Sequence, residues 1–308
     1  MEAHSAEEPR TYRSPSSFPE TAPPPSIFRA TRIEHALRSA LRPGEAQTPP
    51  LLAAAVRHAL FPGGARLRPR LCLAVAACCG DPEPHHADAA AAAVEMLHCA
   101  SLVHDDLPCF DAADTRRGQP TVHRAFGETT AVLTGDHLIV LAFEHLARAC
   151  ESSPRRLPAL IGLLARGVGA PHGIIAGQAW EAESKVDAAL YRRAKTGALF
   201  EAAAALGAVA AGASPTAWGF VGARIGEAYQ VADDILDVMG DPDRLGKPVG
   251  QDATHARPNA VAELGLAEAR RLFDRLVRDA VAAIPACDDP EPVRSWLADA
   301  ERRARGAI

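Results

Sequence analysis

Apolar residues recur at helical spacing along most of the chain, and no stretch alternates as a half-buried strand would. Gly and Pro residues divide this pattern into long segments. The segments that we expect to be helical are 30–41, 50–60, 70–79, 85–103, 121–149 with breaks near 127 and 135, 153–183 with gaps, 188–211, 215–239, 265–284 and 290–304. The sequence therefore predicts an all-α fold of long helices in one domain, without strands.

The ends of this pattern carry further signals. Residues 1–28 contain six Pro and many Ser, Thr and Glu, which predicts a disordered tail before a domain that covers 29–308. Residues 241–260 are charged, contain Pro and Gly and lack an apolar period, so we expect a long loop, and long loops are commonly functional. Asp187 is the predicted N-cap of the helix that follows it.

Composition narrows the class of protein. Hydrophobic residues make up 48% of the 308, enough for a sizeable core, and the abundance of Ala over aromatics favours close-packed helices. A formal net charge of −5 argues against nucleic-acid binding. No apolar run reaches the roughly 18–20 residues of a membrane span, and the first residues do not resemble a signal peptide. Seven Cys without a CxxC pair are typical of a reduced, cytoplasmic protein.

An acidic cluster follows one of the longest predicted helices. Its members are Asp105, Asp106, Asp111 and Asp114, and the pair Arg116 and Arg117 comes directly after them. Carboxylates this close repel one another unless a cation lies between them, and oxygen ligands suit a hard ion such as Mg²⁺. A guanidinium pairs with two phosphate oxygens at once. The stretch indicates either a metal–diphosphate site or a solvated, acidic helix end.

A second acidic cluster favours the metal site. Asp233, Asp234 and Asp237 lie near the end of another long predicted helix. The spacing of four residues places Asp233 and Asp237 on one helix face, with Asp234 beside them. Two such clusters predict the two halves of one metal site.

Several motifs, in this order, resemble those of the trans-isoprenyl (polyprenyl) diphosphate synthases. They are Gly63-Gly64-Ala65-Arg66-Leu67-Arg68-Pro69, Asp105-Asp106-Leu107-Pro108-Cys109-Phe110-Asp111, Arg116-Arg117-Gly118, Gly177-Gln178-Ala179-Trp180-Glu181, Lys195-Thr196, Gln230 with Asp233-Asp234-Ile235-Leu236-Asp237, and Gly246-Lys247-Pro248-Val249-Gly250-Gln251-Asp252. The resemblance covers the chain from residue 29 onward and is nearest to bacterial geranylgeranyl diphosphate synthases. It implies an isoprenoid synthase-type bundle of long helices around a central active-site cavity.

The resemblance also implies a Mg²⁺-dependent prenyltransferase, with about three ions per site that stabilise a departing diphosphate. The substrates would be isopentenyl diphosphate and the allylic dimethylallyl, geranyl and farnesyl diphosphates. The allylic diphosphate ionises, the double bond of isopentenyl diphosphate attacks the carbocation, and a proton is lost. Apolar walls must shield that carbocation from water.

Residue roles follow from the same resemblance. The metal positions are Asp105, Asp106, Asp111, Glu181, Asp233, Asp234 and Asp237, with a Glu181 where the family usually has Asp. The positions that face the allylic diphosphate are Arg116, Lys195, Thr196, Gln230, Lys247 and, more weakly matched, Arg257. Those for isopentenyl diphosphate are Gly64, Arg68, His98 and Arg117. The catalytic set is Asp105, Asp106, Asp111, Lys195, Asp233, Asp234 and Lys247.

Two further positions bear on substrate and product. Ala65 replaces a lysine that usually touches isopentenyl diphosphate, which would cost about 1.5–3 kcal/mol of binding, and Arg66 is the candidate to compensate. Ala100 and Ser101, about one turn before Asp105, are small where bulky aromatics end the tunnel of fifteen-carbon synthases. We therefore expect the twenty-carbon geranylgeranyl diphosphate, with farnesyl diphosphate as the alternative.

Two other functions are compatible with the fold. A non-catalytic subunit that regulates a partner synthase usually lacks aspartates of a cluster, whereas this chain retains all six. A terpene cyclase typically lacks the Gly-Gly turn and the Arg116-Arg117 pair. The family resemblance further implies a homodimer and a product that feeds carotenoids or the prenyl tail of a tetrapyrrole.

Overall fold

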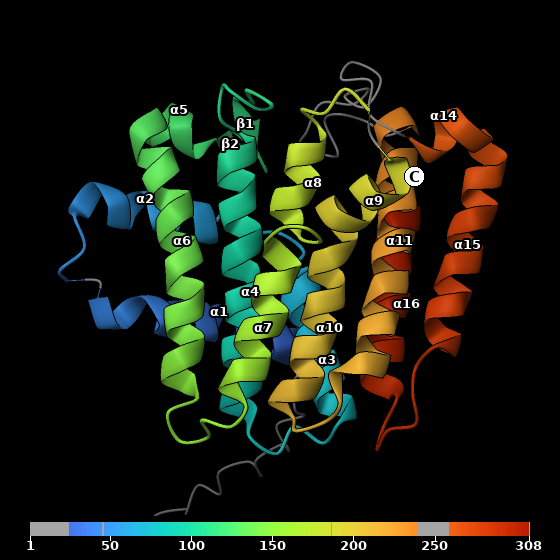
Figure 1. Ribbon diagram of the computed structural model, residues 1–308, viewed down its shortest axis with the longest axis horizontal. Coiled ribbons are helices and arrows are strands. Elements are labelled where there is room, and N and C mark those ends of the chain that lie inside the picture. Colours follow the sequence, from blue (N-terminus) through green and yellow to red (C-terminus); the bar gives the residue numbers. More distant parts are fainter. Residues whose placement is uncertain (1–24, 45, 186, 240–258, 308) are drawn as a thin grey trace, which may run out of the picture.

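Helices of up to 25 residues make up most of the computed structural model, which describes residues 25–44, 46–185, 187–239 and 259–307 (Figure 1). The elements are α1 (Pro25–Leu41), a 3₁₀ turn η1 (Arg42–Gly44), α2 (Pro50–Leu60), α3 (Leu67–Cys78), α4 (Pro84–Asp105), β1 (Thr115–Arg116), β2 (Gln119–Pro120), α5 (Val122–Phe126), α6 (Glu128–Ala149), α7 (Leu157–Val168), α8 (Ile174–Trp180), α9 (Ala188–Arg192), a π turn η2 (Arg193–Gly197), α10 (Ala198–Ala210), α11 (Pro215–Met239), α14 (Ala260–Leu264), α15 (Leu266–Ala282) and α16 (Glu291–Ala307). The predicted all-α fold is confirmed.

The centre of the bundle is formed by α4 and α10, two helices in which most residues are buried. Every residue of α10 except Glu201 is buried, and α10 packs against α3, α4, α7 and α11. Small side chains permit these close approaches. A Cβ at Gly207 would lie 2.2 Å from the Cys72 carbonyl oxygen of α3. A helix that is apolar on all sides has to be surrounded by others, as α10 is.

Local signals in the sequence placed several helix ends correctly. The helix α2 has the predicted bounds, and Gly127 separates α5 from α6. The Asp187 carboxylate accepts hydrogen bonds from the backbone N–H groups of Ala189 and Leu190, at 2.9 and 3.1 Å, as an N-cap does. The helix α1 begins at Pro25, within the tail that was predicted to end at residue 28. Residues 1–24 lie outside the described part of the chain.

The predicted break at Gly135 is wrong, because α6 continues through it. This glycine instead gives room to the neighbouring helix: a Cβ there would lie 2.1 Å from the His104 Nε2 atom. The predicted helix 188–211 is also divided, since η2 inserts a π turn between α9 and α10. Single π turns inside α-helices are common at functional sites.

The expectation of no strands is wrong at one short hairpin. β1 pairs with β2 in antiparallel fashion, and the two-residue connection is Arg117-Gly118, with φ of +53° and +75°. Positive φ at both positions is the signature of a type I′ turn. Two-residue strands are too short to produce an alternating pattern, so the sequence did not reveal them.

The ends of α4 and α11 lie at the same end of the bundle. In Figure 1, α4 leads up to the β1–β2 hairpin, and α11 leads up toward α14 at the same upper end. The two acidic clusters are therefore carried to one end of the molecule. None of the described helices combines the length and the apolar character that a membrane crossing requires.

Candidate active site

The first acidic cluster begins at the last residue of α4. Asp106 is 3% exposed and receives a bidentate pair from Arg116, with Nε at 2.8 and 2.9 Å from its two oxygens and Nη2 at 2.5 Å from Oδ1. Burial raises the pKa of the Asp106 carboxyl, and the Arg116 guanidinium opposes that rise. Two of the predicted site residues thus neutralise each other before any substrate is considered.

Asp105 is held differently. Its Oδ1 atom is buried and accepts no hydrogen bond from the residues described, and the Lys195 Nζ atom lies 4.0 Å away. Burial raises the pKa of this carboxyl, Lys195 counteracts the rise, and Asp111 adds to it. A buried carboxylate oxygen without a hydrogen bond is costly unless a cation satisfies it. The donor set of Asp105 and Asp111 therefore fits an oxygen-preferring ion such as Mg²⁺.

In the second acidic cluster, on α11, the Asp234 carboxylate is hydrogen-bonded within the protein. Both oxygens of Asp234 accept hydrogen bonds, Oδ1 from Gln230 Nε2 and Oδ2 from the Ala260 backbone N–H, each at 2.7 Å. Asp234 is 1% exposed, so it anchors the start of α14. Asp233 and Asp237 share a face of the continuous helix, as their spacing predicted.

A cationic pocket lies beside the first cluster. Arg117 donates to the Gly63 carbonyl oxygen over 2.7 Å, and a Cβ on Gly64 would lie 2.7 Å from the Arg117 Cζ atom. Arg68 Nη1 lies 3.5 Å from His98 Nε2. Glycine is needed at position 64, where φ is +125° and the guanidinium packs directly against the backbone.

The charges around the cationic pocket shift the pKa values of His98 and Arg68. Burial lowers the pKa of His98 well below its usual value, and Arg68 and Arg117 lower it further, so the imidazole stays neutral at pH 7. Burial also lowers the pKa of Arg68, whereas the negative charge of Asp233 raises it. Neutral His98 can serve an anion as a hydrogen-bond donor, while the arginines supply the charge.

Arg66 does not compensate for the lysine that Ala65 replaces. Its backbone is left-handed, with φ of +48°, and this turns the side chain into the core, where it is 6% exposed. There Nη1 donates to Glu95 over 2.7 Å and Nη2 donates to the Leu60 carbonyl oxygen over 2.6 Å. The expected compensation is wrong because Arg66 is already committed to a buried ion pair.

The predicted chain-length residues differ in exposure. Ala100 is 1% exposed, whereas Ser101 is half-buried, like His98 and Asp105 on the same stripe of α4. The Ser101 hydroxyl donates to the His98 carbonyl oxygen over 2.8 Å. Ser101 is therefore the better placed of the two to contact a substrate bound beside His98 and Asp105.

The structure brings most of the predicted site residues to the same end of the bundle. The first cluster joins with Arg116, Lys195 and Glu181, and the cationic pocket joins Gly64, Arg68, His98 and Arg117. Thr196 lies beside Lys195 in η2, half-buried. Lys247 and Arg257 lie outside the described residues, as does most of the predicted loop 241–260.

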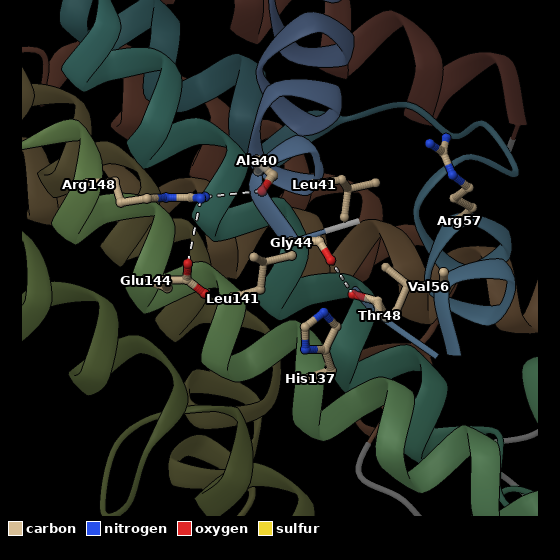
Figure 2. A pocket seen from close by; sticks show the side chains of 11 residues that line it. Ala40, Leu41, Gly44, Thr48, Val56, Arg57, His137, Leu141, Glu144 and Arg148 are labelled. Atoms are coloured by element: carbon tan, nitrogen blue, oxygen red, sulfur yellow. Dashed lines mark hydrogen bonds and ion pairs between the residues drawn. The ribbon is translucent and has the colours of Figure 1, made fainter. Parts of the chain in front are cut away.

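One pocket is lined by Asp106, Arg116 and Arg117 and therefore belongs to this site. A second pocket opens between α1, α2 and α6 and is lined by none of the predicted site residues (Figure 2). In it Arg148 is held by Glu144, at 3.5 Å, and by the Ala40 carbonyl oxygen, at 3.1 Å. We assign the chemistry to the end of the bundle, where carboxylates and arginines gather.

Sequence reasoning missed the residues that hold the site together. Tyr191 donates to Glu181, and its position four residues before Lys195, on one helix face, was the available signal. Two glycines pack closely against the π turn. A Cβ on Gly177 would lie 2.4 Å from the Lys195 Cα atom, and one on Gly226 would lie 2.6 Å from the Gly197 Cα atom. The motif glycine Gly177 thus serves helix packing.

A mostly helical bundle with carboxylates and arginines gathered at one end matches the class that the motif resemblance implied, the helical enzymes of isoprenoid chemistry. Known proteins agree. The family model described as polyprenyl synthetase matches residues 49–287. Over 273 residues the chain is 53% identical to a geranylgeranyl diphosphate synthase of Cereibacter sphaeroides, covering 88% of this chain and 93% of that protein. A geranylgeranyl diphosphate synthase of Rhodobacter capsulatus is 52% identical, covering 83% and 89%.

Solved structures agree as well. A geranyltransferase from Helicobacter pylori, complexed with magnesium and isoprenyl diphosphate, superimposes with a TM-score of 0.72 at 30% identity and covers 93% of this chain and 98% of that one. The chain belongs to the polyprenyl synthetase family. Membership confirms the predicted enzyme class, a trans-prenyltransferase, within a family that depends on magnesium.

Proposed function

We propose that this chain condenses isopentenyl diphosphate with allylic diphosphates and that its main product is the twenty-carbon geranylgeranyl diphosphate. The observation that carries the site chemistry is the buried, unsatisfied Asp105 oxygen beside Lys195. The product length is supported by the small residues Ala100 and Ser101 and by the similarity to geranylgeranyl diphosphate synthases.

The residues divide the reaction between them. The predicted metal positions would hold Mg²⁺, about three ions by family resemblance, which when bound neutralises charge on the departing diphosphate. These positions are Asp105, Asp106, Asp111, Glu181, Asp233, Asp234 and Asp237. Lys195, Thr196 and Arg116 orient the allylic diphosphate. Because Arg116 is paired with Asp106, we expect it to share its guanidinium between that carboxylate and the diphosphate.

The second substrate is assigned to the cationic pocket. Arg117, Arg68 and neutral His98 bind the diphosphate of isopentenyl diphosphate, and Gly64 lets Arg117 approach the backbone. The allylic C–O bond breaks, the double bond of isopentenyl diphosphate forms the new C–C bond, and the proton passes to the released diphosphate. Gln230, Lys247 and Arg257 stay predicted contacts of the allylic diphosphate.

Two properties of the working protein are part of the proposal. We propose a homodimer, as the family resemblance implies. We also propose that the enzyme works in the cytoplasm, and the seven cysteines, all of them free thiols, support a reduced compartment.

Replacing Ser101 by Phe is expected to change the main product from twenty to fifteen carbons. The half-buried position lies one helical turn before Asp105, so an aromatic ring there fills the space that the tail of a farnesyl chain would need. The product is measured by dephosphorylation and sizing of the alcohol. The control is Ser101→Ala, which removes the hydroxyl without adding bulk and should leave the C20 product. A Ser101→Phe enzyme that still makes mainly C20 would contradict the assignment.

Replacing Ala65 by Lys is expected to lower the KM for isopentenyl diphosphate about tenfold or more. Ala65 is exposed beside Gly64, and a new ammonium there restores a charge-assisted contact of about 1.5–3 kcal/mol that Arg66 does not supply. Initial rates at varied concentrations of isopentenyl diphosphate measure this KM. Ala65→Gln serves as an uncharged control of similar length. An unchanged KM for isopentenyl diphosphate in the Ala65→Lys variant would contradict the idea that the missing lysine weakens binding of this substrate.

A further inference from the structure

Tyr191 is a buried side chain next to the allylic site with no role in the family resemblance. It is 7% exposed, and its hydroxyl donates a hydrogen bond to the Glu181 Oε1 atom over 2.7 Å. The same oxygen accepts a short hydrogen bond from the Lys195 ammonium. One donor from α9 and one from the π turn that follows it therefore share one carboxylate oxygen just after α8.

The backbone around Lys195 is fixed by packing. Lys195 lies in the π turn, which packs closely between Gly177 of α8 and Gly226 of α11. A lysine side chain nevertheless has several rotatable bonds, so a fixed backbone alone does not place its ammonium. That placement requires contacts at the charged end.

Tyr191 and Glu181 supply these contacts. Glu181 binds the ammonium directly, and the Tyr191 ring centroid lies 5.9 Å from Nζ, within the range of a cation–π attraction. Together they hold Nζ 4.0 Å from Asp105 Oδ1. An ammonium has three N–H donors, so it can serve Glu181 and a diphosphate oxygen at the same time.

Glu181 and the substrate diphosphate compete for the Lys195 ammonium, and the Tyr191 hydroxyl weakens the hold of Glu181. By donating to Oε1, it disperses negative charge from the oxygen that holds Lys195 and keeps the carboxylate in one orientation. Without the hydroxyl, Oε1 loses one donor, so Glu181 can change its orientation or bind the ammonium more tightly. Either change makes Lys195 a poorer partner for an incoming anion.

We propose that Tyr191 is a positioning residue for the allylic diphosphate, which acts through Glu181 to hold the Lys195 ammonium beside Asp105. The inference rests on the proposed function, because it takes an allylic diphosphate as the ligand of Lys195. It assigns Glu181 a role in orienting a cation, in addition to the metal role that its motif suggests.

The test uses Tyr191→Phe, which removes only the hydroxyl. Binding of farnesyl thiolodiphosphate, an unreactive allylic analogue, is measured by calorimetry in the presence of Mg²⁺, and the KM for isopentenyl diphosphate is measured separately. We expect about tenfold weaker binding of the analogue and an unchanged KM for isopentenyl diphosphate. The control is Glu263→Gln, which breaks the Arg192–Glu263 ion pair of the adjacent residue and should change neither value.

A double variant tests whether Tyr191 acts through Glu181. In a Glu181→Gln background the added Tyr191→Phe change should have no further effect, because coupled residues are not additive. Additive effects would overturn the proposal, as would equal weakening of both substrates together with a lower Tm. Wild-type protein that does not bind the analogue contradicts the proposed function as well, whereas equal binding by wild type and Tyr191→Phe contradicts this inference alone.

Discussion

Replacement of Asp105 by Asn is expected to lower kcat/KM by about 10²–10³, the usual cost of removing one electrostatic contact to a developing charge. Asn has the same shape but no charge, and it cannot replace the buried carboxylate oxygen that lies 4.0 Å from Lys195. Steady-state kinetics with farnesyl and isopentenyl diphosphates at several Mg²⁺ concentrations measure the loss. We expect the Mg²⁺ dependence to shift to higher concentrations.

The thermal stability of the Asp105→Asn variant should not fall with its activity. Because burial raises the pKa of Asp105, the ionised carboxylate is less favourable in the folded protein than in the unfolded chain at neutral pH. Its removal should therefore leave Tm unchanged or raise it, as is common when a functional charge is lost. The control is Asp114→Asn, an exposed position in the same stretch that pairs with Arg124 at 2.9 Å. Activity of Asp105→Asn within tenfold of wild type would contradict the metal-site assignment.

Replacement of Arg66 by Met is expected to lower the free energy of unfolding by about 3–5 kcal/mol, because it leaves a buried charge without its partner. Glu95 is 1% exposed and receives the Arg66 guanidinium at 2.7 Å. Urea denaturation monitored by circular dichroism measures the change.

The double variant Arg66→Met with Glu95→Leu serves as the control for this pair. It removes both charges and should recover most of the lost stability, since apolar residues can replace a buried ion pair at little cost. A single Arg66→Met variant within about 1 kcal/mol of wild type would show that the pair is not what fixes the loop before α3.

The fold was predictable because long apolar periods dominate this sequence, and α2 was predicted residue for residue. The π turn was not, because one extra residue in a helix leaves the apolar pattern around Lys195 almost unchanged. Gly135 shows a second limit: a glycine that ends a helix and one that admits a neighbouring His104 look alike in one sequence.

The family motifs predicted that Asp106 and Arg116 belong to one site. They did not predict that these two residues, ten positions apart, pair with each other. Gln230 is a local partner of Asp234, but Asn259 and Ala260 lie 25 and 26 residues away, so its role in anchoring α14 had no local signal. The inward turn of Arg66 depends on its left-handed backbone, which residue type does not reveal.

The central claim is that this prenyltransferase makes a twenty-carbon product. The purified protein, incubated with Mg²⁺, dimethylallyl diphosphate and labelled isopentenyl diphosphate, is treated with phosphatase, and the labelled alcohols are sized by chromatography. The account predicts geranylgeraniol as the main alcohol. Farnesol as the main alcohol, or no turnover without an added partner synthase, would contradict it.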